Sequence, residues 1–580
     1  MNFLRTTFMS GYKSKAYPNY WDLIALLLVL GVITLLAWVA RQMAVPYQLG
    51  QAISISLDPN HLPGYALRTV LRMLIALFFS LLFTFIFATW AAKSRRAERI
   101  IIPFIDILQS VPILGFLSIT VVGFIGLFPG SLLGPECAAI FVIFTSQAWN
   151  MALGFYQTVR SVPTELNEAG NMFHLSAWQR FWRIDVPFSL PGLLWNMMMS
   201  MSAGWFFVVA SEAISVSNQQ ILLPGIGSYI TLAIASADMR AIGYAILTMF
   251  IVILVYDQLL FRPLVAWAEK FKAEQVAEDT KEARSWLINL LHRTRFLRYL
   301  STQLTYLFDL FVNIAFLRSK PIHSHRPRMS HYARYITWLW NTLLICLISG
   351  VLIFLYHIVF HSVPFATIEH IFSLGLITAL RVLVLVVVCT LIWVPIGVWV
   401  GLRSNVAHIV QPIAQFLAAF PANLLYPLVV ILIVKYHLNI NIWVTPLMIL
   451  GAQWYILFNV VAGASVMPKD LLQVADNLGL GFWLRWRRLI LPGIFPYYIT
   501  GAITAVGGAW NASIVAEVVT WGDHKLVASG LGAYITEQTL KGDFLHIALG
   551  IGMMCVLVLI FNRLIWRPLY MLSRERFTLD

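Results

Sequence analysis

Four ionisable side chains lie within long apolar runs of this sequence, where a charge needs a counter-charge or a polar cavity. They are Arg72, Arg381, Glu212 and Glu517. An arginine in mid-bilayer costs about 2.5–3.5 kcal/mol on insertion scales. Two uses of the arginines are open: they attract an anion into a path through the membrane, or they snorkel or pair with carboxylates. Because a bare carboxylate repels anions, the glutamates are predicted to form structural ion pairs or hydrogen bonds, with these arginines as candidate partners.

Aromatic and amide side chains near these charges are further candidates for the lining of a path. Together with the four charged residues, the candidates are Trp205, Trp510 and Asn511. The alternative for tryptophan is helix packing, because large aromatic side chains belong mostly to the core. Prolines in "LQSVP" and "LAAFPANLLYP" free backbone groups inside the protein, as ligand paths require.

The elements that carry these residues are predicted to be membrane-spanning helices. Hydrophobic residues make up 59% of the 580 residues and charged residues 11%, with a mean hydropathy of +0.78; soluble domains carry about 25% charged residues. Since about 20 apolar residues span a bilayer, we expect an all-α polytopic membrane protein with about twelve transmembrane helices, the first of them retained rather than cleaved. The expected spans are 21–40, 66–92, 101–128, 133–157, 188–211, 241–261, 336–360, 372–401, 408–434, 441–463, 493–520 and 544–566.

The net charge is +14, and the basic residues are concentrated on one predicted side of the membrane. Basic clusters such as "KSRRAER", "RFWR" and "RWRR" fall on the same side of successive turns, which is the positive-inside bias. This bias predicts that both termini are cytosolic, and it argues against nucleic-acid binding. The four cysteines lack metal-ligand spacing and are expected to be small buried hydrophobes.

The chain is an internal duplication. From Trp149 and Trp454 onward the two halves align without gaps at a constant offset of 305 residues, and upstream the offset is 309. Matched pairs are Arg72 with Arg381, Pro112 with Pro421, Pro163 with Pro468, Trp205 with Trp510, Glu212 with Glu517, Gly225 with Gly530 and Gly227 with Gly532. Since six spans return the chain to the same side, the repeat is parallel. The predicted domains are residues 1–262, a linker at 263–335, and residues 336–580.

The linker contains apolar residues at helical spacing with interleaved arginines, which predicts a helix on the inner membrane surface. Its histidines His323, His325 and His331 are interpreted as part of a basic linker rather than a metal site.

A polar loop recurs in both halves, as Val162–Pro187 and Met467–Pro492. We name these segments the first and second coupling loops. Pro163 or Pro468 lies near the start of each loop, where proline suits a helix start, and apolar residues at helical spacing follow. This pattern predicts a short amphipathic helix on the membrane surface. Pro187 and Pro492 are expected to end the loop and to restart the chain as the next span. A loop that is kept twice at fixed length predicts a docking surface rather than a plain connection.

These loops resemble the cytoplasmic E-A-A, x3, G, x9, I-x-L-P loop of permeases in ATP-binding-cassette importers. Each copy departs from the letters, because the first lacks the glycine and the second lacks the glutamate. The positions carried over as ATPase-coupling residues are Glu168, Ala169, Gly170 and His174 in the first loop, and Gln473, Val474, Ala475 and Gly479 in the second. The segments around "W-x6-E" and "G-[IL]-G" further resemble the nitrate, sulfonate, taurine and bicarbonate type, in a form with two fused six-helix type I units.

The resemblance implies a non-enzymatic transport subunit in a bacterial inner membrane that imports a small anion. ATP and Mg would be bound by two copies of a separate ATPase, since this sequence has no GxxxxGK[ST] phosphate loop. A periplasmic or lipid-anchored solute-binding protein would deliver the substrate. Two alternatives remain at this point: a twelve-helix secondary transporter not driven by ATP, and a membrane-embedded enzyme, for which no acidic or histidine cluster is found in both halves.

Overall fold

A computed structural model describes residues 20–43, 45–47, 53–216, 219–268, 286–313 and 363–576, with a few single positions between 342 and 353. By its internal contacts the chain divides into two compact units. Unit 1 comprises residues 1–42, 154–198 and 254–321, and unit 2 comprises residues 43–153, 199–253 and 322–580. This division cuts through helices, so the predicted domain boundaries at 262 and 336 stay a prediction.

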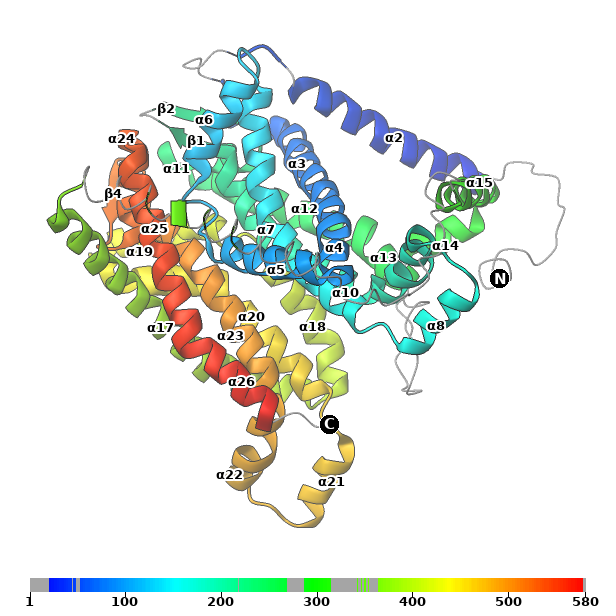
Figure 1. Cartoon of the computed structure of the whole chain (residues 1–580). Helices are drawn as coiled ribbons and strands as arrows, with labels where there is room; N and C mark the ends of the chain where they lie inside the picture. Colours follow the sequence, from blue (N-terminus) through cyan, green and yellow to red (C-terminus); the bar gives the residue numbers. More distant parts are fainter. Residues whose placement is uncertain are drawn as a thin grey trace. The chain divides into compact units, whose positions relative to one another are not determined.

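The described residues are mostly helical (Figure 1). Unit 1 contains α2 (Tyr20–Met43), α8 (Thr164–Met172), α9 (Ala177–Arg180), α13 (Arg262–Ala268), α14 (Trp286–Arg293) and α15 (Arg295–Val312). Helices α7 (Leu133–Arg160), α10 (Val186–Glu212) and α12 (Met239–Tyr256) run through both units. In its first half, unit 2 contains α3 (Leu62–Phe83), α4 (Thr89–Lys93), α5 (Arg95–Ser110), α6 (Leu117–Leu127) and α11 (Ile226–Ala235). In its second half it contains α17 (Phe365–Gly401), α18 (Ser404–Ala419), α19 (Tyr426–Lys435), α20 (Ile440–Ser465), α21 (Lys469–Asn477), α22 (Phe482–Arg485), α23 (Leu491–Ala516), α24 (Leu531–Lys541), α25 (Phe544–Phe561) and α26 (Arg567–Arg576).

Eight helices within the described residues are long and apolar enough to cross a membrane. They are Pro59–Lys93, Leu133–Arg160, Ala177–Glu212, Met239–Ala268, Phe365–Gly401, Ile440–Ser465, Phe482–Ala516 and Phe544–Ser573. Seven of them contain a predicted span in full. The predicted span at 493–520 is too long, because its helix ends at Ala516 and a β-strand begins at Val518. The predicted span at 21–40 lies within α2. The predicted span at 336–360, and the linker histidines, lie mostly or wholly outside the described residues.

The third predicted span of each half is wrong as a single straight helix. In the first half, α5 ends at Ser110 and α6 begins at Leu117. In the second half, Ile413–Ala419 and Ala422–Lys435 meet at an angle of 75°. Pro112 and Pro421 lie at the two breaks. Proline disfavours the helical conformation of the residue before it, and Val111 and Phe420 are indeed extended.

The expectation that Pro187 and Pro492 end the loop is also wrong. The helix continues through them, from Ala177 to Glu212 and from Phe482 to Ala516. Instead, a π-helical segment precedes each proline at the same place in both halves, at Phe181–Asp185 and Trp486–Ile490. Proline has no N–H and its ring clashes with the carbonyl four residues earlier, and a widened turn relieves that clash without breaking the helix. Asp257–Phe261 and Asn562–Trp566 precede Pro263 and Pro568 in the same way.

Two small hairpins, not predicted from the sequence, follow α10 and α23. Strand β1 (Ala213–Val216) pairs antiparallel with β2 (Gln219–Leu222), and β3 (Val518–Trp521) pairs with β4 (His524–Val527). Within unit 2 the hairpin β3–β4 and α24 lie at the end away from α21 and α22 (Figure 1).

Beyond the hairpins, matched aspartates begin the last helices. Asp238 Oδ1 accepts the Arg240 and Ala241 N–H groups at α12, and Asp543 Oδ1 accepts the His546 N–H group at α25. This last bond lowers the pKa of Asp543.

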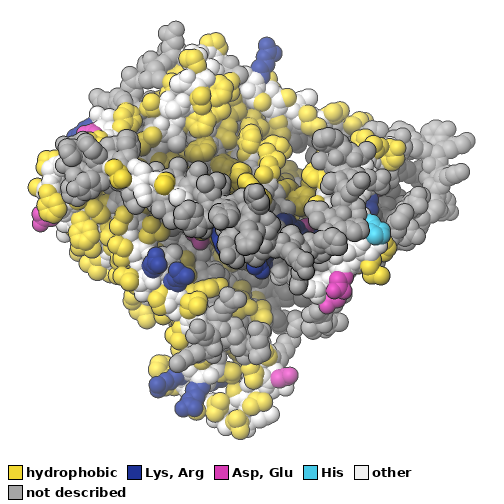
Figure 2. Space-filling view, viewed as in Figure 1, with side chains coloured by type: hydrophobic (Ala, Val, Ile, Leu, Met, Phe, Trp, Pro, Cys, Tyr) yellow, Lys and Arg dark blue, Asp and Glu magenta, His cyan; other side chains and the backbone are white. Residues whose placement is uncertain are grey.

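The core of unit 2 is built from both halves of the duplication, with Leu117 and Val142 of the first half in one buried cluster with Leu447 and Trp510 of the second. Large apolar side chains also cover much of the face in view (Figure 2); Leu391 and Leu564 are among the exposed ones. An apolar exterior on long helices is what a lipid environment requires. The chain is therefore a multi-pass membrane protein.

Candidate functional site

The arginine of the first half is buried in a network of two carboxylates. Arg72 of α3 donates from Nε and Nη2 to both carboxylate oxygens of Glu136 on α7, at 2.6 and 2.7 Å. Its Nη1 donates to Glu212 Oε1 at 2.6 Å. Glu212 also accepts the Thr69 hydroxyl and the Gly227 backbone N–H, each at 2.6 Å. All three charged groups are fully buried, so the predicted Arg72–Glu212 pairing is present and the charges are compensated within the protein.

The second half repeats this network with a different third partner for the arginine, and with its backbone donor one residue later than the matched Gly532. Arg381 of α17 donates to Glu517 Oε1 at 2.9 Å, and Glu517 accepts the Thr378 hydroxyl and the Ala533 N–H. The second carboxylate is absent, because Arg381 Nη2 instead donates to Asn441 Oδ1 at 3.1 Å. Arginine, threonine and glutamate therefore keep their geometry across the duplication, and the third partner does not.

The two halves differ at two charged positions, one acidic and one basic, and both positions are neutral in the second half. Glu136 occupies the position of Asn441 at the offset of 305 residues, and Arg68 occupies that of Ile377 at the offset of 309. Arg68 interacts electrostatically with Glu136 in the first half. One acid and one base are thus present or absent together, which keeps the formal charge of both networks the same. Sequence reasoning missed Glu136 and Asn441 because their letters differ; the repeated T-x-L-R of Thr69–Arg72 and Thr378–Arg381 was the available signal.

The paired glycines of each half make these networks possible. A Cβ on Gly225 would lie 2.2 Å from Glu212 Cδ, and one on Gly530 would lie 2.3 Å from Glu517 Oε1. A Cβ on Gly227 would lie 2.2 Å from the Val209 carbonyl oxygen of α10. The glycines therefore let the N-terminal end of α11 or α24 approach the carboxylate. There the positive end of the helix dipole favours a negative charge.

The other candidate path residues have packing or capping roles in this conformation. Trp205 and Trp510 are almost completely buried, and Trp510 packs against Phe561. Asn511 of α23 accepts the Ile113 backbone N–H at 2.7 Å, a donor that lies within the break between α5 and α6. The assignment of Arg72, Arg381, Glu212, Glu517, Trp205, Trp510 and Asn511 to a translocation path stays a prediction.

The two coupling loops have the same backbone. Helices α8 and α21 each contain nine residues and begin after Pro163 and Pro468. Each is followed by a residue in the left-handed conformation, His174 at φ +50° and Gly479 at φ +59°. The position is a helix C-terminal cap, and histidine tolerates this conformation better than most residues other than glycine. Histidine therefore replaces glycine at this position of the first loop without changing the backbone conformation of the helix cap.

Each loop presents a similar surface. Among the eight carried-over positions, Glu168, His174, Gln473, Val474 and Gly479 are exposed, Ala169 is half-buried, and Gly170 and Ala475 are buried. In both loops an arginine donates back to the helix, Arg180 to Asn171 and Arg485 to Asp476.

The position before the left-handed residue is apolar and exposed in both loops, as Phe173 (74%) and Leu478 (68%). An apolar side chain presented on a rigid cap is a typical anchor for a partner protein.

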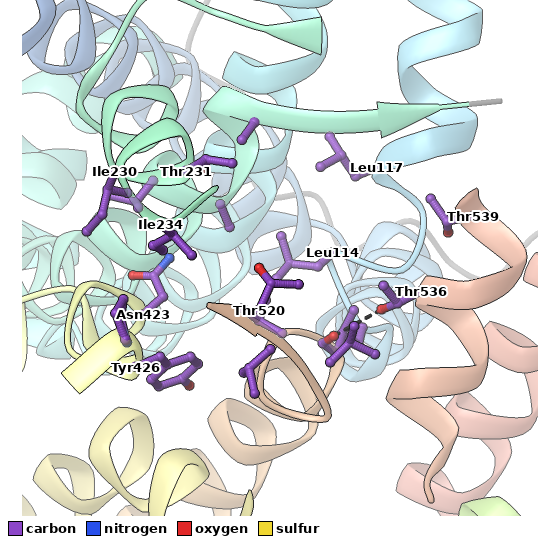
Figure 3. Close-up of a pocket in the computed structure, with 18 of the residues that line it drawn as sticks. Leu114, Leu117, Ile230, Thr231, Ile234, Asn423, Tyr426, Thr520, Thr536 and Thr539 are labelled. Atoms are coloured by element: carbon purple, nitrogen blue, oxygen red, sulfur yellow. Dashed lines mark hydrogen bonds between the residues drawn. The ribbon is translucent and has the colours of Figure 1, made fainter. Parts of the chain in front are cut away.

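A cavity of about 300 Å³ lies within unit 2 where the two halves meet. It is lined by α11, β3 and α24 and by the bent segments at Leu114–Leu117 and Asn423–Val430 (Figure 3). The lining contains no Lys, Arg, His, Asp or Glu. Its polar groups are amides and hydroxyls: Gln220, Thr231, Asn423, Tyr426, Thr520, Thr536 and Thr539. Asn423 Oδ1 and Tyr426 Oη are buried with no hydrogen-bond partner among the described residues. The cavity can therefore hold a small polar solute by neutral contacts.

Comparison with known proteins places these features in a family. The chain matches the family described as binding-protein-dependent transport system inner membrane component, over residues 80–260 and again over residues 393–567. These two matches cover more than half of the chain. The chain belongs to this family. Both the permease resemblance and the fused, duplicated form predicted from the sequence are confirmed, and the matched regions include both coupling loops.

Similar proteins are transport permeases. The bicarbonate transport system permease protein CmpB of Synechococcus elongatus is 29% identical over 28% of this chain and 57% of its own length. The nitrate import permease protein NrtB of Leptolyngbya laminosa is 30% identical over 20% of this chain and 39% of its own length. The glycine betaine/carnitine transport permease protein GbuB of Listeria monocytogenes is 27% identical over 29% of this chain and 55% of its own length. The chain thus spans about half the length of the relatives it matches.

Proposed function

We propose that this chain is the transmembrane subunit of an ATP-driven importer and forms the translocation path between its two fused permease units. The observation that carries the proposal is the pair of coupling loops. Their helices, left-handed caps and exposed anchors agree in geometry although their letters differ. A twelve-helix secondary transporter needs no such repeated docking surface, so the loops favour an ATPase partner over that alternative.

The proposed partners supply what this chain lacks in sequence. Two copies of an ATPase subunit bind ATP and Mg and contact one coupling loop each. A periplasmic or lipid-anchored solute-binding protein delivers the substrate at the opposite side. The proposed location is a bacterial inner membrane, with both termini and the coupling loops in the cytosol, as the basic clusters indicate.

The proposed substrate is a small anion such as nitrate, bicarbonate or a sulfonate. The family relatives named for bicarbonate and nitrate support this class. The cavity supports it in a specific way: hydroxyl and amide donors can hold an oxyanion, and a solute held without a fixed cation is released easily. Transport requires binding that is favourable enough for entry and weak enough for exit. In this proposal Arg72 and Arg381 stabilise the walls of the path.

Charge at the exposed anchors is expected to separate the chain from its ATPase. Phe173→Glu and Leu478→Glu place a carboxylate at the same position of each loop. Each is expected to weaken ATPase association at least about tenfold, since truncating a central anchor typically costs about 2 kcal/mol or more. The measurement is recovery of the nucleotide-binding subunit with the tagged chain, together with ATP-dependent uptake. Val527→Glu, at an exposed apolar position of β4, is the charge-matched control and should leave recovery unchanged. Uptake that persists without any ATPase, driven by an ion gradient, would contradict the proposal.

Removal of one cavity hydroxyl is expected to lower transport without lowering the stability of the protein. Tyr426→Phe deletes an Oη that is buried and has no hydrogen-bond partner in the described part of the chain, so thermal stability should stay equal or rise slightly. If the hydroxyl serves a passing solute, uptake of labelled nitrate or bicarbonate should fall severalfold. Unchanged uptake of every accepted solute would exclude Tyr426 from the path. Tyr436→Phe, at an exposed tyrosine after α19, is the control.

A further inference from the structure

The linker helix α15 packs directly on the first coupling loop within unit 1. We name Ala177–Trp182 the first elbow and the matched segment Phe482–Arg487 the second elbow. The ring of Phe311 lies 5.2 Å from that of Trp178 and 5.8 Å from that of Trp182, in edge-to-face geometry. The ring of Phe308 lies 5.5 Å from that of Trp182. Edge-to-face aromatic contacts are specific in orientation, so α15 has a defined seat on the elbow.

Two polar contacts fix the register of this seat. Trp178 Nε1 donates to the Phe311 carbonyl oxygen at 3.3 Å, which lies in the last turn of α15, where carbonyls lack partners within the helix. Gln179 Nε2 donates to Asn313 Oδ1 at 2.9 Å. Gln179 is itself fixed by the capping box that it forms with Ser176. The end of the linker helix is therefore attached to the start of the long helix that contains α10.

The second elbow lacks two of the three residues that make this seat. Leu484 stands at the position of Gln179, and Arg487 stands at that of Trp182. The tryptophan itself is kept as Trp483, but it is 76% exposed, and its neighbour Phe482 is 73% exposed. In the described part of the chain, the same tryptophan is thus covered by a helix in one half and left open in the other.

We propose that α15 is a built-in brace of the first coupling loop, and that Trp178, Gln179 and Trp182 are the positioning residues that hold it there. The first loop then meets its partner through α8 and Phe173 alone, while the second loop presents α21, Leu478 and the open second elbow. The two docking surfaces are unequal in extent as well as in letters. This inference rests on the proposed function, because it assigns the unequal surfaces to the two ATPase subunits.

The brace has a mechanical consequence. A loop that is attached to the linker transmits movement to the linker as well as to α10, whereas the second loop transmits movement to α23. Removing the aromatic contact should therefore loosen the link between ATP hydrolysis and transport without touching the solute. Residues that modulate coupling without contacting a ligand change it by about two- to thirtyfold.

The first test is a cross-link in the full-length chain in membranes, with its four native cysteines replaced. Gln179→Cys with Asn313→Cys is expected to be joined by a short thiol-reactive cross-linker, both with and without nucleotide, because the native side chains meet end to end and their backbones are too far apart for a direct disulfide. Gln179→Cys with Leu304→Cys, which lies about 13 Å from Asn313 along α15, is the matched pair and should give no product. Absence of the first product, or formation of the second, would overturn the brace. The cross-link needs no ATPase, so this result is independent of the proposed function.

The second test is a double-mutant cycle in the chain reconstituted with its ATPase in lipid vesicles. Trp178→Ala and Phe311→Ala should each lower the solute imported per ATP hydrolysed by at least about twofold, and the double variant should lower it no further. Trp483→Ala should instead weaken recovery of the ATPase and leave the ratio unchanged. Additive losses, or no loss in either single variant, would overturn the brace. If no ATPase associates with the unchanged chain while the cross-link forms, the proposed function fails and the contact stands.

Discussion

Replacing Arg72 by methionine is expected to destabilise the protein by about 3–5 kcal/mol, the usual cost of removing one partner from a buried ion pair. The substitution leaves the carboxylates of Glu136 and Glu212 without their shared donor in a fully buried site. Neither carboxylate can reach water without moving helices. Glu212 keeps the Thr69 hydroxyl and the Gly227 N–H, but these neutral donors do not balance its charge. Unfolding in detergent, followed by fluorescence of the buried tryptophans, measures the loss.

The internal duplication supplies the controls for this experiment. Arg381→Met leaves only one carboxylate, Glu517, and an amide, so it should cost less than Arg72→Met. The quadruple variant Arg68→Ile, Arg72→Met, Glu136→Gln, Glu212→Gln removes the charges together and should recover much of the lost stability, since uncharged replacement of a buried network is often nearly neutral. A stability of Arg72→Met equal to that of the unchanged chain, or a larger loss for Arg381→Met, would contradict the compensated-network interpretation.

The buried ion pairs could be predicted from the sequence because both halves kept them. An arginine and a glutamate that recur at matched positions in apolar runs need each other on electrostatic grounds alone, and the structure places Arg72 on Glu212 and Arg381 on Glu517. Glu136 could not be found in this way. Its counterpart is Asn441, and four extra residues in the first half hide their correspondence. A partner that changes chemical type between copies is recognised only when the helices are placed in space.

The prolines illustrate a second limit. The sequence marks where an N–H group is missing, but the response of the helix depends on its neighbours. At Pro112 and Pro421 the helix ends and a new helix begins a few residues later. At the first of these breaks Asn511 of the second half accepts a freed backbone N–H. At Pro187 and Pro492 the helix widens and continues. Local propensity is the same in both cases, and tertiary hydrogen bonds decide which outcome is stable. The loop spacing was predicted correctly, whereas the left-handed His174 and the linker seat required the structure.

Gly227→Ala is expected to destabilise the protein by at least about 3 kcal/mol, at the upper end of overpacking effects. The new Cβ would lie 2.2 Å from the Val209 carbonyl oxygen. That atom belongs to the backbone of α10, so no side-chain rotation relieves the clash. The start of α11 must move away, and its Gly227 N–H then leaves Glu212. Steric and electrostatic losses therefore add at one residue, and correctly folded protein should be recovered in low yield.

Glycines with no neighbouring atoms provide the matched controls. They show the effect of the Gly→Ala change itself, so that the remaining loss at Gly227 can be assigned to the close approach of the helices. Gly243 on α12 and Gly552 on α25 have no atom within 4 Å of a new Cβ, so alanine there should be neutral or stabilise the helix by up to about 1 kcal/mol. Gly532→Ala meets the Ser513 carbonyl oxygen at 2.6 Å and should be destabilising, but less so than Gly227→Ala. Full stability of Gly227→Ala would mean that α11 does not pack against α10 as described. It would also contradict the hydrogen bond between Glu212 and the N-terminal end of α11. Because that hydrogen bond also holds the carboxylate that pairs with Arg72, Gly227→Ala and Arg72→Met should be less than additive when combined.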